Sequence, residues 1–157
     1  MSNPPIKEIK QKLLDRIGLI KTGTESGYLN DVTVLNGYMV HYVRKFNESN
    51  EKLKFPCVAL QPTRDRSKIG GGNQRSKSSR DWVLIGAVGV QNPDEVTDNL
   101  DSLLYDIKRA VSFDTYADDS PGLTITLGEA VFDLPERGDE YAFFEMSITI
   151  DYIEGLQ

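Results

Sequence analysis

The amino-acid sequence predicts an α+β domain in which a mixed, largely antiparallel sheet packs against two main helices, of residues about 4–20 and 93–111. Three observations support this prediction. Apolar residues recur at helical spacing in two segments, polar and apolar residues alternate with a period of two in several others, and residues 82–91 are apolar on both faces. The 157 residues are enough for one domain with its own core, which we place over residues 1–157.

The first predicted helix begins after Asn3, with Pro4 and Pro5 in its first turn, which is typical of a capping residue followed by prolines. Gly18 suits the end of this helix. Residues 21–27, with two glycines and several small polar side chains, predict a loop after it. The apolar face of the helix is made of Ile6, Ile9, Leu13 and Ile17.

A β-hairpin is predicted next. Two runs rich in β-branched and aromatic residues, 32–35 and 38–43, flank Asn36 and Gly37. An Asn-Gly pair between two such runs is a strong signal for a tight hairpin turn, so we expect these runs to pair with each other.

Residues 55–62 predict a short strand that contains Pro56 and Pro62 near its ends. Because proline cannot donate to a sheet ladder, both prolines should mark strand ends or an edge position. Cys57, the one cysteine of the chain, lies in the apolar run and is expected to be a buried, unreactive side chain.

Residues 63–80 show no hydrophobic pattern and contain three consecutive glycines at 70–72, so the sequence predicts a long mobile loop. The segment carries six basic residues against one acid, Asp65, a local balance of +5 in a chain whose net charge is −6. Two interpretations stay open: a flexible surface loop with solvated charges, or a partner-binding loop that becomes ordered against an acidic surface. The six basic residues are Arg64, Arg66, Lys68, Arg75, Lys77 and Arg80.

Residues 82–91 predict a central strand, because apolar side chains occupy both of its faces. The clearest helix of the chain follows, over residues 93–111. Asn92 and Pro93 suit its start, and Glu95 lies three residues past the cap, as in a capping box. Its apolar stripe is formed by Val96, Leu100, Leu103, Leu104, Ile107 and Val111.

Residues 113–122 form an acidic, turn-rich link, and residues 123–134 then alternate between polar and apolar side chains, which predicts a strand. The alternation slips at Gly128 and Glu129, which predicts a β-bulge. A turn at 135–140 leads into a last strand with one buried and one polar face. The buried face is expected to hold Ala142, Phe144, Met146, Ile148, Ile150 and Tyr152.

Few residues offer catalytic or metal-binding chemistry. The single histidine, His41, and the single cysteine give no zinc-ligand spacing, and no Gly-x-Ser-x-Gly elbow is present. The glycines at 70–72 lack the spacing of a phosphate-binding loop, and the acidic residues in 114–119 are more simply a solvated turn than a cation site. We therefore expect no enzyme, no cofactor and no metal site.

The sequence also bounds the partners of the protein. The first residues lack the apolar segment of a secretion signal, and no run approaches the roughly 20 apolar residues of a membrane span, so we expect folding in the cytoplasm and no membrane partner. The net charge of −6 disfavours a protein that wraps nucleic acid with its whole surface.

Several segments follow one another in an order that is similar to a known family. They are the first helix, the β-hairpin region after it, the proline-led strand at 56–60 with the loop after it, the strand opening with arginine at 80–85, the Leu-x-x-Leu-Leu-x-x-Ile helix at 100–107, and the last strand at 144–152. In this order, and in size, the chain resembles the tail terminator (tail completion) proteins of long-tailed bacteriophages. The resemblance covers most of the chain, and the loop at 63–80 is longer than the family pattern.

The resemblance implies a structural protein of the virion tail and neck, assembled in the host cytoplasm. Such proteins form a homo-hexameric ring that stops polymerisation of the tail tube protein and docks the head-side connector (stopper) protein. DNA would pass through the ring without specific binding, and an acidic bore is expected. The basic loop would contact a neighbouring subunit, the tube end or the connector.

A ring would need a subunit interface, which we predict near one face of the last strand; a solvated sheet face remains the alternative. The residues concerned are Phe143, Glu145, Ser147 and Thr149. Another neck, connector or baseplate protein is an alternative function, and a nucleic-acid-binding or regulatory module is a further one.

Overall fold

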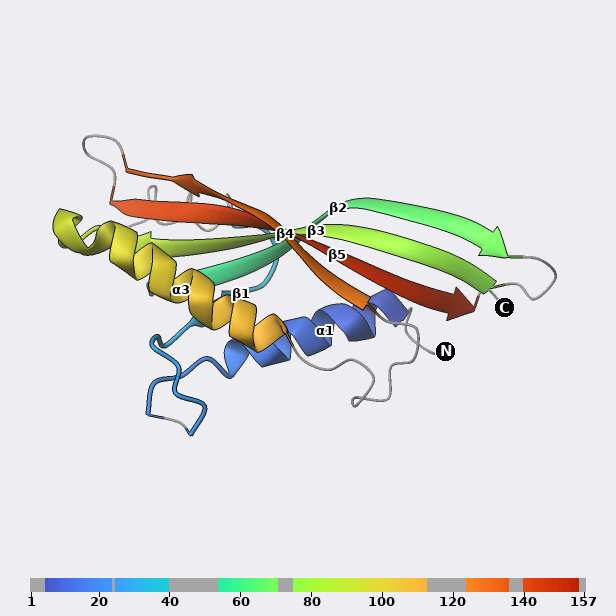
Figure 1. Ribbon diagram of the computed structural model, residues 1–157, viewed down its shortest axis with the longest axis horizontal. Helices are drawn as coiled ribbons and strands as arrows, with labels where there is room; N and C mark the ends of the chain where they lie inside the picture. The colour runs from blue at the N-terminus through green and yellow to red at the C-terminus, as the bar shows by residue number, and fades with distance from the viewer. Residues whose placement is uncertain are drawn as a thin grey trace.

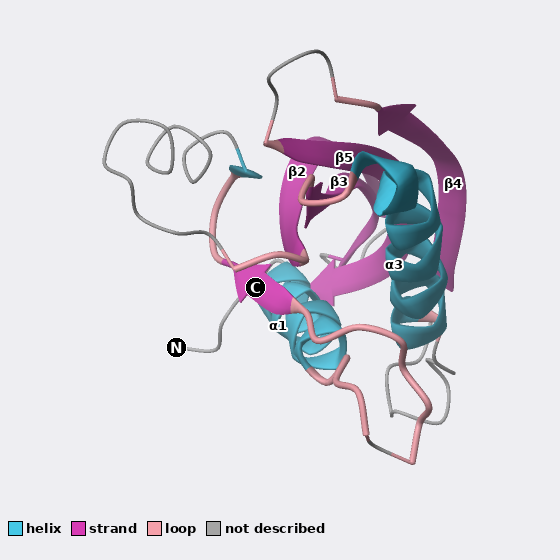
Figure 2. Ribbon diagram, turned by 90° about the vertical axis from the view of Figure 1, so that its left-hand side faces the viewer, coloured by secondary structure: helices cyan, strands magenta, loops and turns pink. Residues whose placement is uncertain are grey.

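The computed structural model describes residues 5–23, 25–39, 54–70, 75–112, 124–135 and 140–155. Both helices lie on the same side of a strongly twisted sheet (Figure 1), which curls around them (Figure 2). The elements are α1 (Pro5–Gly18), β1 (Thr33–Leu35), β2 (Cys57–Gly70), β3 (Arg75–Gly89), the 3-10 turn η1 (Pro93–Glu95), α3 (Val96–Val111), β4 (Thr124–Asp133) and β5 (Tyr141–Gly155).

The strands form one five-stranded sheet in the order β1-β2-β3-β5-β4. β1 pairs parallel with β2, and the other pairings are antiparallel. β3 and β4 therefore run in the same direction with β5 between them, and α3 connects them across the sheet. The chain then returns from β4 into β5. This arrangement confirms the predicted α+β class, including the strand–helix–strand unit that is followed by an antiparallel return.

The second helix begins and packs as its sequence predicts. The Asn92 side chain accepts a hydrogen bond of 3.2 Å from the backbone N–H of Asp94, which caps η1. Lys108 and Arg109 lie in the last turn of α3, where positive charge complements the helix dipole. Every residue of the predicted apolar stripe is buried against the sheet: Val96, Leu100, Leu103, Leu104, Ile107 and Val111.

α3 approaches the sheet closely at Gly86 in the middle of β3. A Cβ atom at this position would lie 2.6 Å from Cζ of Phe144 and 3.1 Å from Cδ2 of Leu103. Since these side chains are fully buried, neither has space to retreat. Glycine at 86 therefore allows the helix to sit directly on β3 and β5.

The central strand β3 is covered on both faces, as predicted. Its Trp82, Leu84 and Val88 join the main core with α1, α3 and β5. Ile85 and Ala87 face the other way, into a smaller cluster that we call the outer apolar cluster. The buried members of that cluster are Leu35, Met39, Cys57, Ala59, Ile85 and Ala87.

The last two strands also follow their sequence patterns. The inward residues of β5 are buried at every second position from Ala142 to Tyr152. The register between β4 and β5 shifts between Leu127 and Ala130, which confirms the predicted bulge at Gly128. The acidic link at 113–122 lies outside the described residues, and so do residues 136–139 of the predicted turn.

The prediction of a mobile loop at 63–80 is wrong. β2 continues to Gly70 and β3 begins at Arg75, and together with the end of β5 they form a three-stranded extension. We call it the arm: residues 63–70, 75–81 and 149–155 (Figure 1). Both faces of its β2 and β3 strands are largely polar, so no hydrophobic period marks them; cross-strand pairing supplies the order instead.

The proline expectations hold. Pro56 directly precedes β2, which begins at Cys57. Pro62 lies inside β2, beyond the three residues that β1 covers, and the register with β3 shifts immediately after it. Within the described residues, Pro62 thus occupies an edge position beside an irregularity, where its missing N–H breaks no ladder bond.

The predicted hairpin at 32–43 does not form in the described part of this segment, residues 32–39. β1 pairs in parallel with Cys57–Ala59 of β2, and neither Tyr38 nor Met39 belongs to a strand. Gly37 does make a turn, with φ of +98°, but the chain then leads Met39 across to β2, where its backbone N–H donates to Oε1 of Gln61. Burial in the outer apolar cluster outweighs the local hairpin signal. Residues 40–43, with His41, lie outside the described residues.

Candidate functional site

The sheet has a polar surface on its outer face, the face turned away from the two helices. The strand register places Arg64 beside Asp81 and Thr149, Arg66 beside Ser79 and Asp151, and Lys68 beside Lys77 and Ile153. Glu145 and Ser147 continue the same row along β5. The structure thus brings four of the predicted basic residues and the predicted interface residues onto one surface, which was not foreseen because they were assigned to separate elements.

Asp81 is the centre of the polar network on this face. Arg66 donates to its two carboxylate oxygens over 2.7 and 3.0 Å, and the Thr149 hydroxyl donates over 2.9 Å. The hydrogen bond from Arg66 is the largest influence that lowers the pKa of Asp81 below its ordinary value. The three strands of the arm are therefore joined by one ionised carboxylate.

Arg80 lies on the opposite, helix-facing side of the arm. Its Nε donates to Asp65 over 2.7 Å, and its guanidinium lies 5.4 Å from the centre of the Trp82 ring. Asp65 also accepts from the Tyr152 hydroxyl over 2.9 Å and from Ser67. Partial burial works to raise the pKa of Asp65, but these hydrogen bonds lower it below its ordinary value. Arg80 is thus part of the internal structure of the arm rather than of the outer surface.

Three of the predicted basic side chains are exposed on the outer face of the arm. Arg64, Lys68 and Lys77 are exposed, and no ion pair joins them to another described residue. Lys68 lies directly across from Lys77, so two like charges meet near the end of the arm. A shallow depression of about 510 Å³ opens beside them, lined in part by Asp151 and Ile153. The side chain of Arg75 lies outside the described residues.

The four predicted interface residues differ in their surroundings. Glu145 and Ser147 are exposed, whereas Thr149 is partly buried and bonded to Asp81. Phe143 packs against the outer apolar cluster and stacks on Tyr141 with ring centres 6.3 Å apart. Phe143 is therefore mainly a packing residue of this face, and replacing it with aspartate would test stability as much as assembly.

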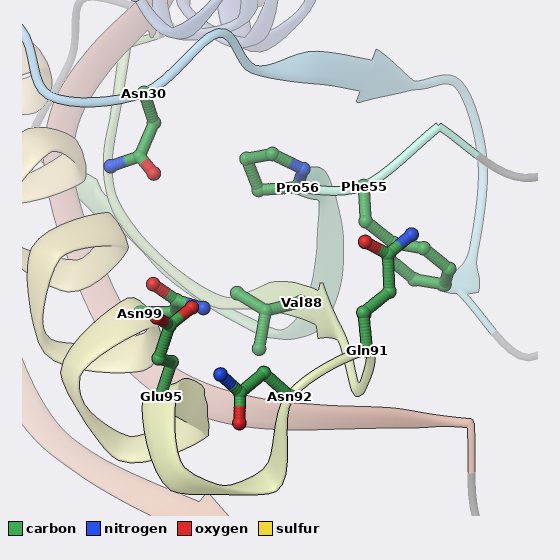
Figure 3. Close-up of a pocket in the computed structure, with 9 residues that line it drawn as sticks. Asn30, Phe55, Pro56, Val88, Gln91, Asn92, Glu95 and Asn99 are labelled. Atoms are coloured by element: carbon green, nitrogen blue, oxygen red, sulfur yellow. The ribbon is translucent and has the colours of Figure 1, made fainter.

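A second concave site lies at the start of α3 and was not predicted from the sequence. It has a volume of about 420 Å³. Figure 3 shows polar side chains of α3 and the segment before it facing Asn30 across the cavity, with Val88 and Pro56 as apolar walls. Its lining is Asn30, Phe55, Pro56, Val88, Gly89, Gln91, Asn92, Glu95 and Asn99. No local motif marks it, because the lining comes from four separate segments.

The cavity holds amide groups and one carboxylate, Glu95, but no serine, cysteine, lysine or histidine among its lining residues. A nucleophile with a neighbouring base is the minimum for covalent catalysis, and these residues do not provide it. Through these side chains the cavity can offer hydrogen bonds to a small polar group.

Near this cavity, Asp106 fixes the loop between α1 and β1 onto α3. One of its oxygens accepts from the backbone N–H groups of Leu29 and Asn30, each over 2.9 Å, and from the Asn30 side chain over 2.8 Å. Asp106 is fully buried. One turn further, Arg109 donates to the carbonyls of Ser26 and Gly27. These contacts hold the segment that carries Asn30 to the cavity.

Comparisons with known proteins found no matching family model and no matching curated protein. Among solved structures, the core region of PilO from the type IV pilus system of Pseudomonas aeruginosa aligns with 12% sequence identity and a TM-score of 0.24. The alignment covers 73% of this chain and 96% of that chain. At this score the likeness supports no conclusion about fold or function. No helix among the described residues is long and apolar enough to cross a membrane.

Proposed function

We propose that the protein is a structural subunit that assembles into a ring, ends the tail tube of a long-tailed bacteriophage and joins the tail to the head-side connector. The observation that carries this proposal is the outer face of the sheet. It presents Arg64, Lys68 and Lys77 together with Glu145 and Ser147 on one exposed surface. A broad surface of mixed charge on a rigid sheet suits contact with another folded protein.

The order of the elements supports the same proposal. An N-terminal helix, a strand after Pro56, a central strand containing Trp82, a crossover helix and two late strands follow one another as the resemblance requires. Two segments depart from that pattern: the described part of 32–43 forms no hairpin, and the segment at 63–80 forms an arm of paired strands rather than a loop. A rigid arm loses little conformational entropy when it docks, which favours a structural role.

The charge arrangement disfavours the nucleic-acid alternative. Asp81 neutralises Arg66 and Asp65 neutralises Arg80, so two of the six basic residues are engaged within the arm. The whole chain has a net charge of −6. Strong binding to DNA needs several free cationic contacts with phosphates, and these residues supply few.

The test is the mass of the purified protein by light scattering, combined with negative-stain electron microscopy. Rings of six copies are expected, together with shorter, capped tubes when the protein is added to a polymerising tail tube protein. DNA binding at physiological salt is expected to be undetectable. A monomer that leaves tube length unchanged contradicts the proposal.

A charge-reversal variant tests whether the arm takes part. Replacing Arg64, Lys68 and Lys77 with glutamate leaves both internal ion pairs of the arm intact. Tube capping should weaken, most strongly at low salt, because the free charges of the arm are reversed. The matched control carries the same substitution to glutamate at Lys7, Lys54 and Lys108, which are exposed and lie outside the arm. Equal capping by both variants would exclude the arm from the contact.

A further inference from the structure

The sheet has two edges that carry unpaired backbone groups. Within the described residues, β4 pairs only with β5, and β2 beyond Ala59 pairs only with β3. Figure 2 shows β4 along the margin of the sheet. A row of free N–H and C=O groups is a template for a further strand. The question is which strand each edge accepts.

β4 has few of the features that prevent pairing with another chain. Residues Thr124–Asp133 contain no lysine, arginine or proline. Val131 is 59% exposed and Phe132 is 41% exposed, and Leu134 directly after the strand is 52% exposed. Only the bulge at Gly128 interrupts the edge. Natural edge strands are usually protected by charge or proline, so this exposed apolar edge indicates a contact surface.

The two edges have opposite charge. β4 carries Glu129 and Asp133 and no basic residue, a net charge of −2. The open stretch of β2 carries Arg64, Arg66 and Lys68 against Asp65, a net charge of +2.

The charged side chains of the two edges also lie on the same face of the sheet. Asp133 lies on the outer face by its pairing with Phe143, and Arg64 lies on the outer face by its pairing with Asp81. A strand pair between two copies would therefore place acidic and basic side chains on the same side of the joined sheet.

The strand directions are also compatible. β2 and β4 run in opposite directions within one sheet, because three antiparallel pairings separate them. A second copy placed beside the first, in the same orientation, would thus bring its β2 antiparallel to β4. Pro62 and the irregularity after it limit the pairing on β2 to the stretch from Arg64 towards Gly70.

We propose that β4 of one copy adds to the arm edge of β2 in the next copy, so that neighbouring sheets join edge to edge. Such a contact uses two different surfaces and repeats head to tail, which is the geometry that closes into a ring. Symmetric pairing of β4 with β4, or of β2 with β2, would set like charges opposite each other. The inference deepens the proposed function, since it rests on ring formation and states how the ring is joined.

A pair of charge-reversed variants tests the contact. The first carries Arg64→Glu and Lys68→Glu, so both of its edges are acidic. The second carries Glu129→Lys and Asp133→Lys, so both of its edges are basic. All four side chains are exposed, so folding should be retained, as circular dichroism and thermal unfolding will show. Association is measured by light scattering and sedimentation over a concentration series.

Each variant alone is expected to associate at least about tenfold more weakly than the parent, and an equimolar mixture should recover the oligomers, because every acidic edge then meets a basic one. If only the first variant associates like the parent, the β2 edge takes no part in the contact and the inference is wrong. If both variants form rings as well as the parent, the edges are not the interface, although the ring itself stands. A parent that stays monomeric overturns the inference and the proposed ring together.

A second comparison does not depend on charge in the arm. Val131→Lys places a charge on the apolar part of the β4 edge. The control, Leu29→Lys, places a charge on the loop before β1, at a side chain that is 58% exposed, against 59% for Val131. Loss of oligomers with the first and not with the second supports pairing at β4. Equal loss, or no loss, in both refutes it.

Discussion

Arg66 and Asp81 face each other across the arm, with the two guanidinium nitrogens 2.7 and 3.0 Å from the two carboxylate oxygens. The pKa of Asp81, and likewise that of Asp65 on the other side of the arm, is lower in the folded protein than its ordinary value. Both carboxylates therefore stabilise the folded state above their unfolded pKa of about 3.9, and this contribution is lost as the pH falls through the folded pKa.

The first prediction follows from the lowered pKa values of these two carboxyl groups. Below about pH 4, the parent should lose stability more steeply with falling pH than a variant with Asp65→Asn and Asp81→Asn, because the variant has no such protons to take up. The measurement is urea unfolding at a series of pH values. Parallel curves for the two proteins would show that these carboxylates do not contribute to acid sensitivity.

The second prediction concerns the close approach at Gly86. Gly86→Ala should lower the free energy of unfolding by about 1–3 kcal/mol, because the added methyl group meets the buried Phe144 ring. The control is Gly18→Ala at the end of α1, where the nearest atom to a Cβ would be 3.8 Å away. The measurement is denaturant unfolding of both variants. A Gly86→Ala protein as stable as the control would mean that the Phe144 ring can move aside.

The third prediction concerns Asp106. Asp106→Ala removes the acceptor for the N–H groups of Leu29 and Asn30, and should cost about 1–3 kcal/mol of stability. Asp106→Asn keeps an acceptor oxygen, so its loss should be smaller. Hydrogen exchange of the Leu29 and Asn30 amides should accelerate in the alanine variant ahead of the α3 amides. Unchanged exchange at both sites would contradict the proposed anchoring of the loop.

The fourth prediction concerns Cys57. Burial raises the pKa of its thiol to about 12, so almost no thiolate exists at neutral pH. A thiol reagent at pH 8 should leave the native protein unlabelled and react only in denaturant. The accessible control is a Leu29→Cys variant, which should take up one label per chain while folded. Fast labelling of Cys57 in the native parent would contradict the buried placement.

The sequence was most informative where local patterns decide the structure. The α3 stripe, the alternation of β5 and the slip at Gly128 are each visible within one short segment, and each is confirmed. Asp106 was missed, yet its signal was present, because it lies within one turn of Leu103 and Ala110 on the buried side of α3. An acid within an apolar stripe indicates a buried hydrogen-bonding role.

The arm and the cavity could not be predicted in the same way. Strand pairing in the arm depends on contacts such as that of Asp65 with Tyr152, which join residues far apart in the chain. The cavity needs Asn30, Phe55 and Glu95 to come together from separate segments. The hairpin at Asn36 failed for a related reason, because the local turn signal holds no information about β2, where the preceding strand finds its partner.

The sheet order has a consequence for biosynthesis. β5 lies between β3 and β4 but follows both of them in the chain, so the ribosome makes two strands before the one that joins them. Until β5 has emerged, the nascent chain exposes an open edge of β3 with its apolar residues, and β4 has no partner within its own sheet. The sheet can therefore be completed only after residues 141–155 have emerged. A truncated chain would expose two strands with unpaired edges to chaperones and to other nascent chains on the same mRNA.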